Sequence, residues 1–114
     1  GIYDEELKDL ELFTPFQNKN TQSSYHLYPI LITPENTKTN QIQFYKKMGE
    51  RNIFVNIHYI PIYLQPFFKN LGFKPGYCPN SEAYFKSVIT LPLHYSLSDV
   101  DHEYIINSIK EILL

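Results

Sequence analysis

The residues of this chain that could take part in acid–base or nucleophilic chemistry are four histidines, one cysteine and scattered carboxylates. Such catalysis needs a nucleophile beside a base, or a base whose pKa lies near neutral pH. The sequence places none of these groups at a spacing typical of such a pair. The candidate chemistry of this chain is therefore binding and positioning.

His58 is the histidine best placed for ligand binding. It ends an expected strand and is followed by Tyr59, Pro61 and Tyr63, so several polar side-chain tips gather where a sheet meets a loop. Loops held by rigid strands often carry binding residues. The alternative is a strand-end histidine bonded to a backbone carbonyl, since most buried polar groups are simply satisfied. The residues alone leave both interpretations open.

The other three histidines favour structural roles. We expect His26 to be half-buried on a strand, His94 to lie in the turn after a strand, and His102 to lie on the exposed side of the last helix. No HxH or HxxxH spacing connects any of them. The sequence therefore predicts no metal site.

Cys78 and Arg51 are the single representatives of their residue types. Cys78 has no second cysteine for an internal disulfide and no adjacent cation to lower the pKa of its thiol, so we expect a small semi-buried side chain. Arg51 sits at an expected helix end, where it can complement the helix dipole or bind an anionic ligand; dipole complementation is the simpler interpretation.

Length and charge limit the class of protein. With 114 residues the chain has room for one domain. Ten basic and twelve acidic side chains give a net charge of -2, which disfavours a nucleic-acid-binding surface. No apolar run is long enough for a membrane span. The single cysteine fits a cytoplasmic protein.

The elements that must position these residues follow from hydropathy periods and turn signals. Helices are expected over residues 3–12, 37–51, 62–71 and 80–87 and at the C-terminus, and strands over residues 24–33, 52–60 and 88–93. We expect a small α+β fold, with an antiparallel or mixed sheet of about three strands and helices packed on it.

Helix faces and caps can also be predicted. Ile42, Tyr45 and Met48 form the expected apolar stripe of the second helix, with Thr39 or Asn40 as its N-cap. Asn80 or Ser81 is the expected cap of the short helix before the last strand, and Ser98 that of the C-terminal helix. In the last helix the expected buried face is Ile105, Ile109, Ile112 and Leu113.

The first helix has no N-terminal capping signal, so we expect it to be the tail of a longer helix that begins upstream. On this hypothesis two apolar surfaces should be exposed or covered by another molecule. One is the face of Leu7, Leu10 and Leu12, and the other is the loop from Tyr59 to Phe68.

The order of short motifs along the chain resembles a known family. YDEEL at 3–7, SYHLY at 24–28, HYIPIY at 58–63, LGF at 71–73 and LPL at 91–93 are similar to the C-terminal part of the DegT/DnrJ/EryC1/StrS family of pyridoxal-phosphate sugar aminotransferases. Within that family the chain looks most like the transaminases that aminate C4 of a UDP-linked 4-keto-6-deoxy-N-acetyl sugar, the step leading to pseudaminic acid.

The resemblance implies a division of the chain and of the enzyme. Residues 1–22 would be the tail of an interdomain helix and a connecting loop, and residues 23–114 the small domain of a fold-type I aminotransferase. In such enzymes a lysine and a Gly-rich segment of the large domain hold pyridoxal phosphate. The lysines of this chain do not match that position, so the chain alone should bind no cofactor and be inactive; they are Lys8, Lys19, Lys38, Lys46, Lys47, Lys69, Lys74, Lys86 and Lys110.

The resemblance also implies substrates and site residues. An amino group, from glutamate, would pass to the C4 keto group of a UDP-linked deoxy sugar in a homodimeric enzyme. His58, Tyr59 and Tyr63 would bind the sugar nucleotide, because imidazole and phenol groups hydrogen-bond hydroxyl and diphosphate oxygens. The competing hypothesis is a stand-alone α+β ligand-binding or protein-interaction module without catalysis, which composition and element order also allow.

Overall fold

The computed structural model describes residues 1–33, 35 and 37–114. The first half contains α1 (Ile2–Leu7), β1 (Tyr28–Leu31) and α2 (Gln41–Glu50). The second half contains the 3-10 turn η1 (Ile62–Leu64), α3 (Pro66–Asn70), α4 (Pro79–Phe85), β2 (Val88–Leu91) and α5 (Asp99–Leu113). The expected α+β class is confirmed. No helix in the described part of the chain combines the length and the apolar character needed to cross a membrane.

The sheet consists of β1 and β2, which run antiparallel with Tyr28 opposite Leu91. The third strand, expected over residues 52–60, is reduced to one bridge in which Asn56 pairs with Thr90. Ile53 and Val55 keep the expected alternation and are buried. The pairing does not continue beyond this bridge, and the chain runs on through Pro61 to η1.

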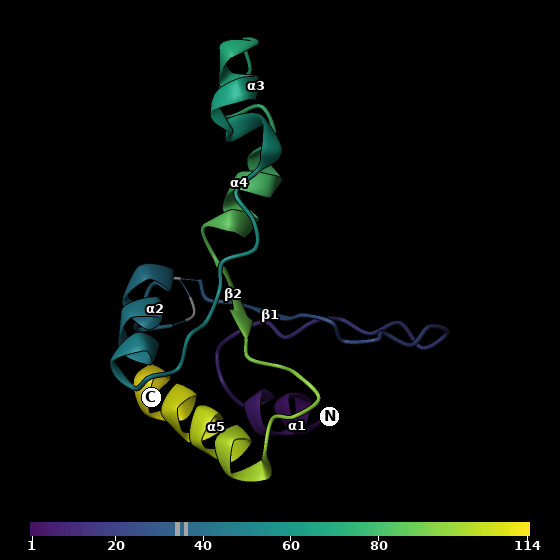
Figure 1. Ribbon diagram of the computed structural model, residues 1–114, viewed down its shortest axis with the longest axis vertical. Coiled ribbons are helices and arrows are strands. Elements are labelled where there is room, and N and C mark those ends of the chain that lie inside the picture. Colours follow the sequence, from purple (N-terminus) through teal and green to yellow (C-terminus); the bar gives the residue numbers. More distant parts are fainter. Residues whose placement is uncertain (34, 36) are drawn as a thin grey trace.

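The hydrophobic core lies between this sheet and α1, α2 and α5 (Figure 1). All four residues of β2 are buried, and α5 buries the face that its apolar period predicts. Ser98 caps α5 as expected, since its hydroxyl accepts a hydrogen bond from the Asp101 amide at 3.1 Å. This core is the rigid base on which His58 and its neighbours are held.

Helix α2 buries a different stripe from the predicted one. Gln41, Phe44 and Met48 face the core, whereas Ile42 and Tyr45 are 63% and 46% exposed. The hydropathy pattern did not predict that Gln41 is buried, because glutamine is polar. Its amide is satisfied in the core by the carbonyl oxygens of Phe85 and Val88, at 2.8 and 2.7 Å. The N-cap prediction is confirmed, with Asn40 as the capping residue.

Helix α1 packs into the same core, so the prediction of an exposed Leu7 face is wrong. Leu7 is fully buried, and Leu10 and Leu12 are partly buried against the core. Glu6 on α1 binds Lys110 on α5 at 2.7 Å, which joins the two ends of the chain. The first twelve residues therefore stabilise the core directly.

Residues 58–87 leave the core as a projecting segment, which we call the arm. It carries η1, α3 and α4 away from the sheet before the chain returns as β2 (Figure 1). The helix expected over 62–71 is divided into η1 and α3, and Gly72 follows it with the positive φ expected there, 105°. Helix α4 begins at Pro79 with Cys78 as N-cap, so the caps expected at Asn80 and Ser81 are not used.

Candidate substrate-binding site

His58 lies where the arm leaves the core. Its Nδ1 is 2.9 Å from the hydroxyl oxygen of Thr90 on β2. Thr90 in turn exchanges backbone hydrogen bonds with Asn56, of 2.7 and 3.2 Å. The imidazole is half-buried, and its partner is this side-chain hydroxyl rather than the backbone carbonyl considered from the sequence. One ring nitrogen is thus held by the core, while the structure gives Nε2 no partner among the described residues.

Tyr59 follows on the surface and is 69% exposed. Its ring lies against the imidazole of His58, with 4.5 Å between the ring centroids. Ile62 and Phe67 extend the exposed apolar surface at 70% and 67%. The prediction of an exposed apolar loop over residues 59–68 is confirmed for these three side chains and is wrong for Tyr63, which is buried. A phenol and an imidazole side by side on this surface can hydrogen-bond the oxygens of a polar ligand.

Tyr63 is placed differently, inside the arm. Its hydroxyl donates to Glu82 Oε2 at 2.5 Å and accepts from the Cys78 amide at 3.2 Å. The same carboxylate oxygen accepts from the Gly76 amide at 2.7 Å. We call these four residues the arm clamp. They join η1 to the loop before α4 and to α4 itself.

The hydrogen bonds of the clamp also shift the pKa values of Glu82 and Tyr63. The hydrogen bond from Tyr63, followed by that from the Gly76 amide, lowers the pKa of Glu82 below its ordinary value. Desolvation, and then the bond to Glu82, raises the pKa of Tyr63. No role for Glu82 was expected from the sequence. The sequence feature that could have indicated this role is a glutamate in the first turn of a short helix, a few residues after Gly76.

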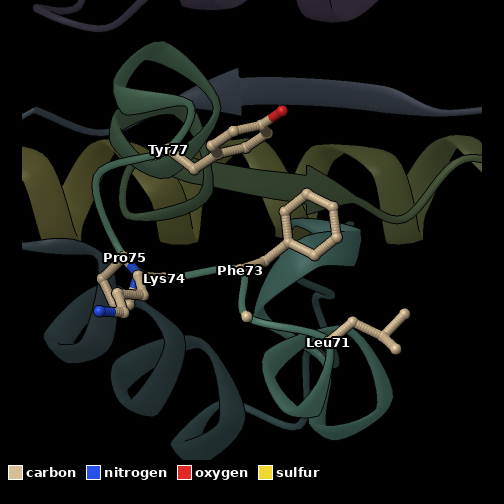
Figure 2. A pocket seen from close by; sticks show the side chains of 6 residues that line it. Leu71, Phe73, Lys74, Pro75 and Tyr77 are labelled. Carbon is tan, nitrogen blue, oxygen red and sulfur yellow. The ribbon is translucent and has the colours of Figure 1, made fainter.

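Aromatic rings pack along the arm beside the clamp. Phe68, Phe73, Tyr77 and Tyr63 follow one another with centroid distances of 6.2, 5.2 and 5.5 Å. Phe73, Lys74, Pro75 and Tyr77 line an open depression of about 400 Å³. Figure 2 shows the rings of Phe73 and Tyr77 on one side and Lys74 and Pro75 on the other. These rings pack against one another along the arm, although Tyr77 is 65% exposed and α3 and α4 contain no buried residue.

The remaining histidines lie elsewhere. His94 is exposed in the turn after β2, as expected, with Nδ1 3.2 Å from Ser96 Oγ. His26 is exposed before β1 begins, so the half-buried strand position predicted for it is wrong. The prediction for His102 is also wrong, because its ring is partly buried edge-on to Tyr3 at 4.3 Å. Burial lowers its pKa, and its Nε2 is buried without a partner.

Cys78 and Arg51 both lie at positions where they support the fold. Cys78 is semi-buried and free, as expected. Arg51 lies at the C-terminal cap of α2, and its guanidinium binds Glu111 of α5 at 2.5 Å. The arginine thus joins two core helices in addition to standing at a helix end.

The chain's residues do not fit pyridoxal phosphate. A site for this cofactor needs a lysine to hold the pyridoxal group and a loop or helix N-terminus to hold the phosphate. The lysines are exposed apart from Lys110, which is half-buried and paired with Glu6. Gly49 lies inside α2, and Gly72 and Gly76 lie four residues apart in the loop between α3 and α4, so the described residues form no glycine-rich phosphate loop.

Comparisons with known proteins agree with the fold and the motifs. The chain is 37% identical over 114 residues to the uncharacterized protein MJ1066 of Methanocaldococcus jannaschii, covering 98% of this chain and 30% of that protein. It is 28% identical to the UDP-4-amino-4,6-dideoxy-N-acetyl-beta-L-altrosamine transaminase of Campylobacter jejuni, covering 99% of this chain and 30% of that protein. The chain therefore spans less than a third of the length of these relatives.

A solved structure and a family model extend the comparison. The apo-form of the sugar aminotransferase Spr1654 from Streptococcus pneumoniae, described as putative, superposes with a TM-score of 0.86 at 30% identity, over 97% of this chain and 28% of that one. The model of the DegT/DnrJ/EryC1/StrS aminotransferase family matches residues 1–110. The chain therefore belongs to the DegT/DnrJ/EryC1/StrS aminotransferase family.

Proposed function

We propose that this chain is the small-domain part of a pyridoxal-phosphate-dependent nucleotide-sugar aminotransferase. The enzyme transfers an amino group, from glutamate, to the C4 keto group of a UDP-linked deoxy sugar. In this proposal residues 23–114 are the C-terminal small domain, and residues 1–22 connect it to the rest of the polypeptide. The Campylobacter jejuni relative, named as a UDP-amino-sugar transaminase, supports this substrate class.

One observation carries the proposal: His58 and Tyr59 stand together on an exposed surface in a chain that belongs to a sugar aminotransferase family. The Thr90 contact holds the imidazole, and the exposed phenol is free to meet a ligand. These groups bind and orient the sugar nucleotide through its hydroxyl and diphosphate oxygens.

Tyr63 contributes to the same site from inside the arm. Its hydroxyl belongs to the clamp with Glu82, so it keeps the backbone of residues 58–63 in place. Binding residues held by such supporting contacts lose less entropy when a ligand arrives. Tyr63 therefore affects the sugar nucleotide through the position of His58 and Tyr59.

The cofactor belongs to another part of the enzyme in this proposal. The curated relatives are more than three times as long as the region they share with this chain, which leaves room for a cofactor domain. The 114-residue chain alone is then inactive, and the complete enzyme acts as a homodimer.

The test uses the natural polypeptide that carries this chain. Replacing His58 or Tyr59 with alanine should raise KM for the UDP-linked keto sugar by about tenfold, the effect of one to two lost hydrogen bonds. The half-reaction with glutamate should keep its rate. His94→Ala, on the exposed turn after β2, is the matched control. Equal loss in both half-reactions, or an unchanged KM for the sugar, would contradict the proposed site.

A further inference from the structure

Thr90 is the core residue that holds the imidazole of His58. Its side chain is 5% exposed and lies on β2, whose four residues are all buried. The backbone of Thr90 pairs with Asn56, two residues before His58. The threonine hydroxyl and the histidine ring are therefore brought together by the same bridge, which fixes their 2.9 Å contact.

The hydrogen-bond donors and acceptors of Thr90 and His58 determine which of the two residues donates. A neutral imidazole has one N–H donor and one acceptor nitrogen, and a hydroxyl donates once and also accepts. Within the described residues the structure gives the Thr90 hydroxyl no acceptor other than His58 Nδ1. If Nδ1–H donated to the hydroxyl, the buried hydroxyl proton would be left unpaired, which is unfavourable. The hydroxyl therefore donates to Nδ1.

We propose that Thr90 holds neutral His58 in the tautomer that carries its proton on Nε2, so that His58 acts as a hydrogen-bond donor toward the ligand. Its target is an acceptor oxygen: a phosphoryl, carbonyl or hydroxyl oxygen of the sugar nucleotide. The identification of the ligand rests on the proposed function. Thr90 is a positioning residue in this scheme, since it acts through His58.

The fixed position of the proton restricts which ligand atoms His58 can bind. An Nε2–H donor pairs with acceptor oxygens, such as those of a sugar diphosphate, and cannot pair with a group that has only donors, such as an ammonium. The neighbouring hydroxyl of Tyr59 can both donate and accept, so the fixed polarity comes from the Thr90–His58 pair.

The first test reads the tautomer by NMR in the 114-residue chain. Nitrogen-15 shifts and long-range proton–nitrogen couplings of His58 are recorded at pH 8.5, above the ordinary pKa of histidine near 6.5. The expected result is a protonated Nε2 and an unprotonated Nδ1. Thr90→Ser keeps the hydroxyl and should keep this tautomer, whereas the equally sized Thr90→Val should give a mixture. A protonated Nδ1 in the native chain, or equal populations in Thr90→Val and native, would overturn the proposal.

The second test measures substrate binding in the natural polypeptide that carries this chain. Thr90→Val should raise KM for the UDP-linked keto sugar by about 2- to 10-fold, the range of one hydrogen bond, and leave KM for glutamate unchanged. Thr90→Ser should remain near the native value. An unchanged KM for the sugar in Thr90→Val, with the tautomer altered, would overturn the donor role of His58.

The two tests separate this inference from the proposed function. If the native polypeptide turns over no nucleotide sugar at all, the proposed function fails, and the tautomer measurement still decides whether Thr90 sets the proton of His58. If turnover is present and the tautomer is wrong, the function stands and the inference fails.

Discussion

Tyr63 and Glu82 form the residue pair on which the shape of the arm depends. Tyr63 is buried although it directly follows the exposed Ile62, and its hydroxyl reaches a carboxylate on α4. The same carboxylate holds the Gly76 amide. A single acidic side chain thus organises two turns of the arm.

Replacing Tyr63 with phenylalanine removes the largest cause of the lowered Glu82 pKa. We expect the Glu82 pKa to rise toward the ordinary glutamate value near 4.3, as followed by a carboxyl carbon NMR titration. Amide exchange at Gly76 should become faster. Tyr77→Phe is the matched control, since Tyr77 is 65% exposed and its hydroxyl has no hydrogen-bond partner within the described part of the chain. An unmoved Glu82 titration in Tyr63→Phe would contradict the clamp.

The clamp also predicts how acid affects the arm. A carboxyl group whose folded-state pKa lies below its unfolded value stabilises the fold above the unfolded pKa, and this contribution is lost as pH falls through the folded pKa. For Glu82 that window lies below the ordinary glutamate pKa near 4.3. Tyr63→Phe should bring the folded-state pKa of Glu82 closer to its unfolded value, so the arm should lose less stability in acid. Amide exchange at Gly76, measured from pH 6 to pH 3.5, can detect this difference.

His102 gives a second pH effect, in the core. Burial holds its folded-state pKa below the unfolded value near 6.5, so the unfolded chain takes up the proton first as pH falls. Its contribution to stability is complete above about pH 6.5 and is lost as pH falls through the lower folded pKa. We expect His102→Phe, which keeps an aromatic ring beside Tyr3, to reduce the drop in urea midpoint between pH 7 and pH 5.

The control for this measurement is His94→Phe, at an exposed position. It should leave the pH dependence of the urea midpoint unchanged. If His102→Phe and the native chain lose the same stability between pH 7 and pH 5, the burial of His102 does not control the acid response.

Single residues show what the sequence could and could not predict. The exposure of Tyr59 was expected from the hypothesis that the loop from Tyr59 to Phe68 is an apolar surface covered by another part of the protein, and its side-by-side arrangement with His58 follows from adjacency. The partners Thr90 and Glu82 lie 32 and 19 residues away from the groups they bind. Such contacts come from the path of the backbone, and no local spacing signals them.

Helix α5 provides the largest buried face among the elements. Its predicted apolar period is confirmed, and Ile109 at its centre is fully buried. Ile109→Ala should lower the free energy of unfolding by about 2–5 kcal/mol, because it deletes buried methyl groups and leaves a cavity. Urea denaturation measures this change. Val100→Ala, on the same helix but 76% exposed, should change it by less than about 0.5 kcal/mol.

Two other elements show why periodicity alone falls short. In α2 the buried stripe includes Gln41, whose amide bonds to two backbone carbonyls, so a polar residue occupies a core position. In the segment 52–60 the alternation of buried and exposed residues is present, yet only Asn56 pairs with β2. An alternating pattern reports burial on one side, whereas strand pairing also needs a neighbouring edge with matching register.

At the scale of the whole molecule, a packed core carries a projecting arm. The core joins α1, α2, α5 and the sheet, and the arm projects from it (Figure 1). On the arm, Tyr59, Ile62 and Phe67 are exposed. Leu7 is buried and not exposed as predicted, because α1 packs against α5. Helical spacing does not reveal such a tertiary contact. The family resemblance, read from motif order, anticipated the fold that the structural comparison supports.

The proposed division between a cofactor domain and this small domain leads to a prediction for the isolated chain. Mixed with pyridoxal phosphate, the 114-residue chain should leave the cofactor's absorption spectrum unchanged, because its lysines are exposed or paired and no phosphate loop is formed by the described residues. A polypeptide that includes the cofactor domain should shift the spectrum. A strong, saturable shift with the short chain would show that cofactor binding resides in these residues.

The most direct measurement is turnover by the natural polypeptide that carries this chain, supplied with pyridoxal phosphate, glutamate and a UDP-linked 4-keto-6-deoxy-N-acetyl sugar. The expected result is equimolar formation of 2-oxoglutarate and the UDP-linked 4-amino sugar. Amination confined to small keto acids, with the sugar nucleotide left unchanged, would contradict a nucleotide-sugar aminotransferase.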